Sequence, residues 1–546
     1  MRVSGPPLLT TDPNGIPMRI DRSRYLALIA MLFAVAMTFI DQTIVAIAAP
    51  TIQSELALSR TGTQWAVNAY LLALAAVFPL GGRLADVQGS RRMVTIGIVG
   101  FAASSALCGA TPTGAPALAW LVAFRAAQGA FGALMIPAAL AIVLAAFPVH
   151  ERGRAMALFF GISGGMTAIG PVVGGYLTQW TWRSIFWVNV PIAVIALVLT
   201  TRATIASSPP RRDRIDIPGA VLVAAGMALS VLGFQQAQTW GWRSPATWSC
   251  ILGGTALLTT FALTELRTAS PLLQLRIFQG RAFFIDNIVL FAASIAFVPA
   301  FFFASVYAQV SLHYQAEHAG LYLLLIFAGY APGAQLGGRL LDKHGARRPM
   351  VLGSALSCAG FALWASKVTE LSLAKQWPFI VMAGAGLGLL VTAASTDAVN
   401  RAINATYGEV IGITQTTRNY GSSLGFAILG TALTTTFAHR LTSTLEHAGI
   451  SPSAAAATAQ RAATSSTISS GLSHAPPGVA HQIQASIGGD FATATRAVLI
   501  GMAIALGAAF IAATRCPRRA PKPSSSDELS GVPRKGPAPQ PQRKGL

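Results

Sequence analysis

The sequence predicts an all-α membrane protein that crosses the bilayer fourteen times, and three observations lead to this fold class. The 546 residues have a mean hydropathy of +0.56 and only 11% of them are charged, whereas soluble domains contain about 25% charged residues. The apolar residues gather into runs of roughly 18–25 residues, the length that a bilayer core requires. A charged sequence between two such runs returns once in the second half of the chain, which indicates an internal repeat.

The apolar runs place the spans, and the basic residues set their orientation. The spans are expected at residues 25–49, 63–82, 93–111, 117–143, 154–178, 185–204, 217–237, 246–264, 284–308, 318–337, 350–366, 377–399, 408–435 and 494–514. Most of the 39 Lys and Arg residues fall on one side when these spans are threaded alternately through a bilayer. Because cytoplasmic segments carry the excess of Lys and Arg, we expect a multi-pass protein of the cell inner (plasma) membrane with both termini in the cytoplasm.

The chain divides into five predicted regions. Residues 1–24 form a cytoplasmic N-terminal tail, and residues 25–204 form a six-helix bundle. Residues 205–283 are a linker with two extra transmembrane helices. Residues 284–514 form a second six-helix bundle with a long outer loop at 438–493, where Ala, Ser and Thr are also compatible with an amphipathic helix. Residues 515–546 are rich in Pro, Ser, Arg and Lys and are expected to be a basic, disordered cytoplasmic tail near anionic lipid.

The repeated sequence follows the second span of each half. Residues 82–92 and 338–348 both read G-R-L-x-D-x-x-G-x-R-R. Gly82 and Gly338 are expected to end a helix, and the second glycine of each copy permits a positive φ in a tight turn. A loop that serves only as a topology signal is the alternative, but it would need neither the glycines nor the aspartate. We therefore interpret the sequence as a gating loop with these residues: Gly82, Asp86, Gly89, Arg91, Arg92, Asp342, Gly345, Arg347 and Arg348.

Two charged residues stand well inside predicted spans. Asp41 lies past the middle of the first span, and Arg125 lies in the fourth. A charge at the bilayer centre costs about 2.5–3.5 kcal/mol on insertion scales, so each should have a partner or a function. We predict that Asp41 can bind and release a proton and that Arg125 bonds to Asp41 or to carbonyl groups. A structural role in helix packing is the alternative for both.

Three other charged residues near span ends are weaker candidates. Arg418 is expected to form an inner latch with Asp86, and snorkelling of its long side chain is the alternative. Asp86 and the paired arginines of its loop are also expected to form ion pairs with neighbouring helix ends. Asp286 and Asp397 are more typical of helix-end groups than of proton carriers.

Composition excludes several classes of protein and site. The net charge is +20, but the basic residues lie between apolar spans and not in an aromatic-basic patch, which argues against nucleic-acid binding. The cysteines have neither disulfide nor metal-site spacing, so no metal site is expected; they are Cys108, Cys250, Cys358 and Cys516. Because the phosphate-binding sequence G-x-x-x-x-G-K-[ST] is absent, we expect no direct coupling to ATP, and an ion gradient should drive the protein. We expect neither enzymatic activity nor a cofactor, only a proton gradient.

Several stretches carry a resemblance to a known family. Besides the repeated loop they are residues 39–50 (FIDQTIVAIAAP), 125–129 (RAAQG), 170–175 (GPVVGG), 182–191 (WRSIFWVNVP) and 216–219 (DIPG). Together they resemble the major facilitator superfamily and, within it, the fourteen-helix drug:H⁺ antiporters of the EmrB/QacA type. In that group the GPVVGG stretch lies on an antiporter helix, here with Gly170, Pro171, Gly174 and Gly175, whose small residues let helices approach and slide.

The resemblance implies a fold and a function. The fold is two six-helix bundles plus two extra central helices. The function is proton-coupled export of drugs or other cationic or amphipathic compounds by alternating access. Asp41 is then expected to carry the coupled proton, for which a cationic substrate competes directly. A facilitator or importer of a small metabolite on the same fold and a non-transporting membrane sensor are the alternatives. The expected partners are the small-molecule substrate and membrane lipids, and the use of a periplasmic adaptor stays open.

Overall fold

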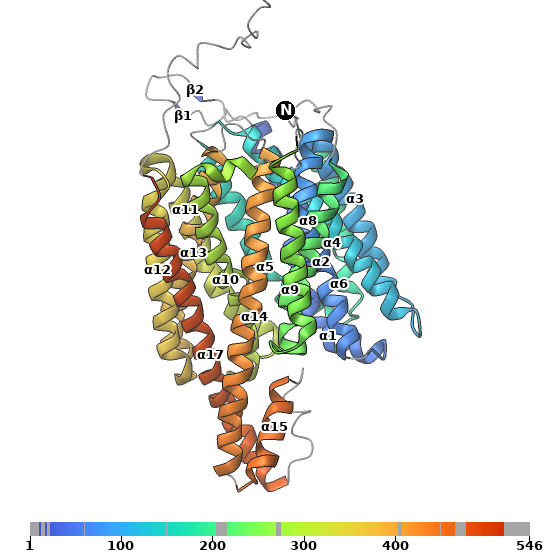
Figure 1. The fold of residues 1–546 in the computed structure, drawn as a ribbon, viewed down its shortest axis with the longest axis vertical. Helices are drawn as coiled ribbons and strands as arrows, with labels where there is room; N and C mark the ends of the chain where they lie inside the picture. The colour runs from blue at the N-terminus through green and yellow to red at the C-terminus, as the bar shows by residue number, and fades with distance from the viewer. Residues whose placement is uncertain are drawn as a thin grey trace, which may run out of the picture.

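The computed structural model describes residues 10–11, 17–18, 22–58, 60–148, 151–203, 216–268, 273, 275–401, 407–447, 449–464 and 477–517. In this part of the chain the long helices lie side by side in one elongated bundle (Figure 1). A short antiparallel pair of strands, β1 (Thr10–Thr11) and β2 (Pro17–Met18), precedes the first helix. The predicted all-α polytopic fold class is confirmed.

The helices follow the predicted apolar runs closely. Those of the first half are α1 (Arg22–Glu55), α2 (Arg60–Gln88), α3 (Ser90–Gly109), α4 (Ala117–Ala146), α5 (Arg152–Thr178), α6 (Ser184–Trp187) and α7 (Asn189–Arg202). The linker holds α8 (Ile217–Trp240), α9 (Pro245–Glu265) and the 3₁₀ turn η2 (Leu275–Gln279). Those of the second half are α10 (Arg281–Val310), α11 (Ala316–His344), α12 (Arg347–Lys367), η3 (Val368–Glu370), α13 (Leu373–Arg401), α14 (Tyr407–His447), α15 (Pro452–Thr464) and α17 (Pro477–Thr514).

The number of long helices fits the predicted fourteen. Twelve spans in the described residues are long and apolar enough to cross a membrane, and α6 and α7 together form one of them. Two further long helices, α5 with 27 residues and α14 with 41, run through the same bundle (Figure 1).

Each half has its own core, and the halves meet along two helix pairs. In the first half α4 packs against α2 and α3, and in the second α13 packs against α11 and α12. One cluster of buried apolar residues fills the second half. Two others fill the first half, and one of them extends across the loop end to Ala398 of α13 and Val410 of α14. Contacts between halves run mainly along α5 with α11 and along α2 with α14. Both repeated loops lie at one end of the bundle, which we call the loop end, where α2 and α11 terminate and α5 begins.

The two extra helices lie at the seam between the halves. Asp216 caps the first of them, α8, by accepting a hydrogen bond from the Gly219 amide at 3.0 Å, a favoured arrangement at a helix N-terminus. α8 packs against α2, α14 and α9. α9 is more peripheral, since Leu252 on it is 61% exposed, as expected for a lipid-facing side chain.

The structure corrects the predicted helix ends at the repeated loop. Gly82 and Gly338 do not end helices, because α2 continues to Gln88 and α11 to His344. The chain turns instead at Gly89 and Gly345, whose φ angles are +92° and +77°. The charged residues 83–88 and 339–344 therefore continue their helices. Each helix ends where helices commonly end, at a glycine with positive φ.

The predicted outer loop at 438–493 is helical where the structure describes it, apart from a turn at residues 449–451. α14 continues to His447, α15 follows, and α17 begins at Pro477. These segments extend beyond the rest of the bundle, away from the loop end (Figure 1). Ala455 and Ala459 of α15 are fully buried in a segment that packs on α14. The high helix propensity of alanine explains why this stretch is not a loop.

The first residues of the predicted disordered tail, 515–517, have a defined structure. Among them, Cys516 is only 1% exposed. Residues 518–546, most of the predicted tail, lie outside the described part of the chain.

Candidate functional site

Asp41 of α1 and Arg125 of α4 form a buried ion pair in the first half. Arg125 Nη1 donates to Asp41 Oδ2 at 2.5 Å and to Gln128 Oε1 at 2.7 Å. Gln128 Nε2 in turn donates to Asp41 Oδ1 at 3.0 Å. Asp41 is 0% and Arg125 1% exposed. Both carboxylate oxygens therefore have donors, which is the condition under which a buried charge pair is tolerable.

α2 completes this network from the other side of the guanidinium. Arg125 Nε donates to the Ala66 carbonyl at 3.2 Å, and the guanidinium carbon lies 4.5 Å from the centre of the Tyr70 ring. The Tyr70 hydroxyl donates to the Thr38 carbonyl of α1 at 3.2 Å. A proton on Asp41 would remove the negative charge that holds Arg125. One proton can therefore change how α1, α2 and α4 are held together.

α5 packs against α1 next to this ion pair. A Cβ atom at Gly170 would collide with the Thr43 hydroxyl and would lie 2.9 Å from the Ile40 carbonyl oxygen. A Cβ atom at Gly174 would lie 2.7 Å from Ile44. These α1 residues flank Asp41 in the sequence. The glycines of the predicted antiporter helix thus set the distance between α5 and the segment of α1 that carries the carboxylate.

A cavity of about 180 Å³ lies between the two halves. Its wall combines apolar and aromatic side chains with amides and hydroxyls from α1, α2, α8, α10, α11 and α14. The lining residues are Gln42, Thr43, Leu71, Leu74, Ala75, Gln235, Val298, Phe301, Phe302, Ser305, Val306, Gln309, Leu323, Asn419, Ser422, Ser423 and Phe426. Apolar walls with a few polar groups are typical of small-molecule sites.

Asp41 does not line this cavity. The residues that follow it, Gln42 and Thr43, do, whereas the Asp41 side chain faces α4. α1 therefore presents the cavity wall on one face and the ion pair on another. The predicted direct competition between a cation and a proton at Asp41 does not fit this geometry.

A second ion pair joins the halves at the loop end. Arg83 Nη1 of α2 donates to Glu409 Oε1 of α14 at 3.3 Å, with both side chains buried. Arg83 lies inside the first repeated loop sequence, and Glu409 lies in the first turn of α14. This contact supplies a latch between halves that the sequence analysis did not identify.

The second loop copy also reaches across to the other half. A Cβ atom at Gly153 would collide with Asp342 Oδ1, so this carboxylate lies beside the first turn of α5. A carboxylate is favoured at a helix N-terminus, where free amide groups and the helix dipole are positive. Asp86, its counterpart, is half-buried in the last turn of α2.

Arg418 has partners other than the one that the sequence analysis predicted, and Arg91 bonds to a backbone carbonyl group. Arg418 donates to Gln415 Oε1 at 2.8 Å, and its guanidinium lies between the rings of Phe160 and Phe297. It occupies these contacts in place of the predicted latch with Asp86. Arg91 is exposed and donates to the Thr201 carbonyl at 3.3 Å.

For the other predicted site residues, the structure gives the burial of each side chain that it describes. Gly82 is buried within α2 and Gly175 is half-buried on α5, while the side chain of Pro171 lies outside the described part of the chain. The remaining arginines of the loops are exposed or half-buried: Arg92, Arg347 and Arg348.

A family model described as Major Facilitator Superfamily matches residues 31–426. The chain belongs to the major facilitator superfamily. The predicted family is thus confirmed, and the chain is a member of a family of membrane transporters.

Known members of the superfamily with similar sequences are resistance and export proteins. The tetracenomycin C resistance and export protein of Streptomyces glaucescens is 32% identical over 74% of each chain. The puromycin resistance protein pur8 of Streptomyces alboniger is 32% identical over 76% of this chain and 82% of its own. The multidrug resistance protein Stp of Mycobacterium tuberculosis is 32% identical over 79% of each. The solved proton:xylose symporter XylE shares the fold, with a TM-score of 0.53 and 13% identity over 86% of this chain and 94% of its own.

Three participants in this transporter's polar contacts were not among the predicted site residues. Glu409 carried one usable signal, an acidic residue at the start of an apolar span. Gln128 stands one turn after Arg125 and can therefore share its partner. Tyr70 had no signal, since a tyrosine in an apolar run is ordinary.

We expect the Arg83–Glu409 pair to stabilise the closed loop end. Arg83→Glu alone should place two carboxylates together and lower the melting temperature and transport, since breaking a buried pair costs roughly 3–5 kcal/mol. Adding Glu409→Arg should restore much of both. Arg440→Glu, at an exposed position of α14 outside both repeated loops, serves as the control in melting and vesicle transport assays. Wild-type melting and transport in the Arg83→Glu variant would contradict this role.

The α1–α5 contact predicts a sharp difference between two glycines of one helix. Gly170→Ala should reduce transport strongly, because the added methyl group meets α1 beside Asp41. Gly161→Ala should be tolerated, because the nearest atom to its added Cβ is 4.0 Å away. Transport rates measured at equal membrane expression test this. Equal activity of the two variants would mean that the close approach is not required.

Proposed function

We propose that this protein is a proton-coupled exporter of amphipathic small molecules, a multidrug efflux antiporter that works by alternating access. The observation that carries the proposal is the buried Asp41–Arg125 pair on the helix that also lines the central cavity. The resistance and export functions named for its relatives support the substrate class. The loop end faces the cytoplasm in this proposal, because the paired arginines of both loops gather there.

The cavity wall suggests what the substrate is like. Phe301, Phe302 and Phe426 offer aromatic faces, while Gln42 and Asn419 offer hydrogen-bonding amides. Among the residues that the structure describes in this wall, none is charged. The site is thus suited to apolar or aromatic compounds with a few hydrogen-bonding groups. A positive charge on the substrate is compatible with cation–π contacts but has no carboxylate in the wall to bind it.

Proton coupling in this proposal is indirect and passes through α1. Deprotonated Asp41 holds Arg125 and fixes α1 against α4. When a proton from the outer side binds Asp41, Arg125 keeps only its neutral acceptors, Gln128 and the Ala66 carbonyl. α1 is then free to shift against α5, which moves Gln42 and Thr43 in the cavity wall. Proton loss to the cytoplasm restores the ion pair and resets the wall for the next substrate.

The loop-end contacts would act as the inner gate. Arg83–Glu409 and Asp342 at the start of α5 hold the two halves together there. For the cavity to open to the cytoplasm, both contacts must break. Because each side chain lies near the end of its helix, water can solvate the separated charges, which limits the cost of opening.

Substitution of Asp41 tests the proton site. Asp41→Asn should abolish drug uptake driven by a proton gradient in inverted vesicles, since the amide cannot gain and lose a proton. Drug–drug exchange without a gradient should continue, because Asp41 is not in the cavity wall. Asp216→Asn, which keeps a good helix cap, is the matched control.

Two outcomes would revise the proposal. Full gradient-driven transport in Asp41→Asn would move the proton site elsewhere. Drug movement out of inverted vesicles along with protons, in the wild type, would indicate an importer.

The extra helix α8 should influence which drugs are exported. Gln235 projects into the cavity wall, and its Oε1 atom is buried without a hydrogen-bond partner. Gln235→Leu should weaken the binding of transported substrates that donate a hydrogen bond, by about 1–3 kcal/mol, or roughly 5- to 150-fold in apparent affinity. Purely apolar substrates should be spared. Gln236→Leu, next to it but outside the wall, is the control. An unchanged drug profile would exclude α8 from substrate recognition.

A further inference from the structure

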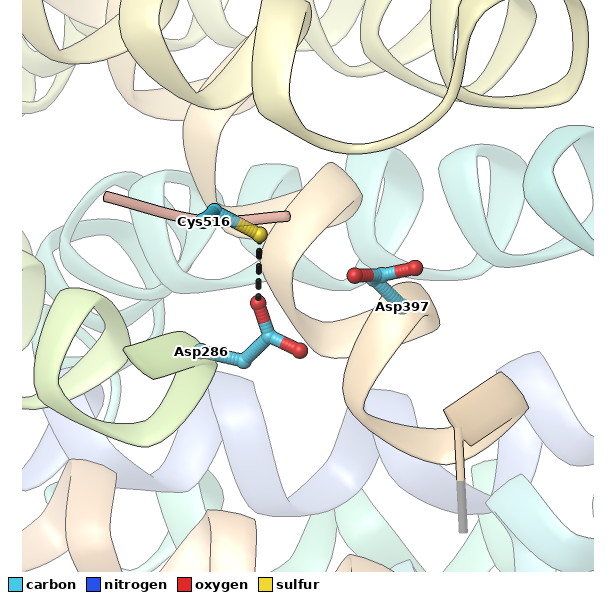
Figure 2. A group of neighbouring side chains, drawn as sticks. All are labelled: Asp286, Asp397 and Cys516. Carbon is cyan, nitrogen blue, oxygen red and sulfur yellow. Dashed lines mark hydrogen bonds between the residues drawn. The ribbon is translucent and has the colours of Figure 1, made fainter. Parts of the chain in front are cut away.

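A group of buried ligand-type side chains lies at the loop end of the second half, apart from the cavity and the Asp41–Arg125 pair. Asp286 lies in α10 near its beginning, Asp397 lies in the last turns of α13, and Cys516 follows the end of α17. Figure 2 shows the two carboxyl groups and the thiol turned toward one another from three separate segments. One ligand atom of each lies within 4.8 Å of the others. Their exposed fractions are 0%, 4% and 1%.

The polar contacts in this group leave one oxygen atom unsatisfied. Arg401 Nε donates to Asp397 Oδ2 at 2.6 Å. The Cys516 thiol is the donor to Asp286 Oδ1, at a long 4.0 Å. Asp286 Oδ2 is buried and has no hydrogen-bond partner, and in Figure 2 the carboxyl group of Asp286 points into the group. The carboxyl groups of Asp286 and Asp397 face each other, and a buried carboxylate oxygen that no donor reaches is costly, so a positively charged ligand between them is favoured.

We propose that Asp286, Asp397 and Cys516 bind one divalent metal ion of the zinc type. Zn²⁺ is bound by cysteine thiolate and by aspartate oxygen, and a site with three protein ligands leaves a fourth position for water. A thiolate selects Zn²⁺ or its softer relatives over Mg²⁺ and Ca²⁺, which prefer oxygen ligands alone. The spacing of the cysteines in the sequence predicted no metal site, because the three ligands come from segments far apart in the chain.

The charges of the group agree with a divalent ion. Two carboxylates and one thiolate carry three negative charges, and Arg401 and a divalent cation carry three positive charges. The complete site would thus be neutral, which matters in a buried position. Arg401 would act as a positioning residue, since its bond to Asp397 Oδ2 orients that carboxylate and leaves Oδ1 for the metal.

A metal here would join three helix ends of the second half. α10, α13 and α17 would be fixed to one another close to the repeated loop at residues 338–348. The loop end must change its contacts when the inner gate opens. Binding of the metal would therefore stiffen one side of this gate without contacting the substrate.

Cadmium binding tests the proposal on the purified full-length protein in detergent under reducing conditions. Cd²⁺ should titrate to one ion per chain with the ultraviolet charge-transfer absorption of a cadmium–thiolate bond. Zn²⁺ should compete for this ion, and excess Mg²⁺ should not. Cys516→Ser should abolish the absorption, and Asp286→Asn should weaken binding at least tenfold. Cys358→Ser, which removes a thiol far from these carboxylates, should leave it unchanged.

The wild-type titration alone can overturn the proposal, so it does not depend on whether the variants fold. Absence of a saturable cadmium–thiolate band would do so, and would leave a proton shared by the two carboxyl groups as the explanation for the unpartnered oxygen. A band that persists in Cys516→Ser, or disappears in Cys358→Ser, would assign the metal to another thiol. The titration needs neither drug nor proton gradient, so its result is independent of the proposed export function.

Discussion

The buried ion pair between Asp41 and Arg125 is the constraint on which the first half depends. Neither charge could remain at this depth alone, because removing one partner leaves an uncompensated charge in a medium of low polarity. The pair therefore fixes the distances between α1, α2 and α4, and the Ala66 carbonyl and the Tyr70 ring hold the guanidinium at the junction. Any event that neutralises Asp41 must change this packing. Binding of one proton is enough to neutralise Asp41, so a transporter can couple proton binding to helix movement.

Helices pack closely both inside the halves and along the α5–α11 seam, and the seam differs by the charged groups at its loop end. Within the second half, α11 and α13 approach so closely that a Cβ atom at Gly388 would collide with the Tyr330 carbonyl oxygen. Such contacts break only at a large loss of dispersion energy. At the loop end α5 and α11 are equally close, because a Cβ atom at Gly338 would collide with the Gly153 carbonyl oxygen. The halves are also joined there by charges near helix termini, Arg83 with Glu409 and Asp342 with the start of α5. These groups can exchange protein partners for water, so the seam between the halves is the place where the molecule can open.

Much of the fold and part of the site could be predicted from the sequence. The spans follow from apolar runs, because a bilayer imposes their length, and Asp41 and Arg125 stand out because charges there are rare. What could not be predicted depends on how distant segments dock. Glu409 meets Arg83 only after the two halves associate, and Cys516 is buried only because the end of α17 reaches α10 and α13. The predicted contact between Arg418 and Asp86 could not be judged from the sequence for the same reason, since the neighbours of Arg418, Phe160 and Phe297, come from two other helices.

In the proposed mechanism, the separation of the Asp41–Arg125 charges from the cavity explains how one protein can couple a proton to varied drugs. If Asp41 formed the cavity wall, only cations that fit its carboxylate would be coupled to the proton. In this structure the Asp41 carboxylate lies on the face of α1 that is turned toward α4, where it bonds to Arg125. The cavity wall is made of apolar side chains, aromatic rings, amides and hydroxyls. Such a wall binds compounds mainly through their shape and apolar area. These contacts require less exact positioning of the substrate's atoms than an ion pair does. The proton acts on α1 as a whole, so coupling does not require that every substrate contact the same atom.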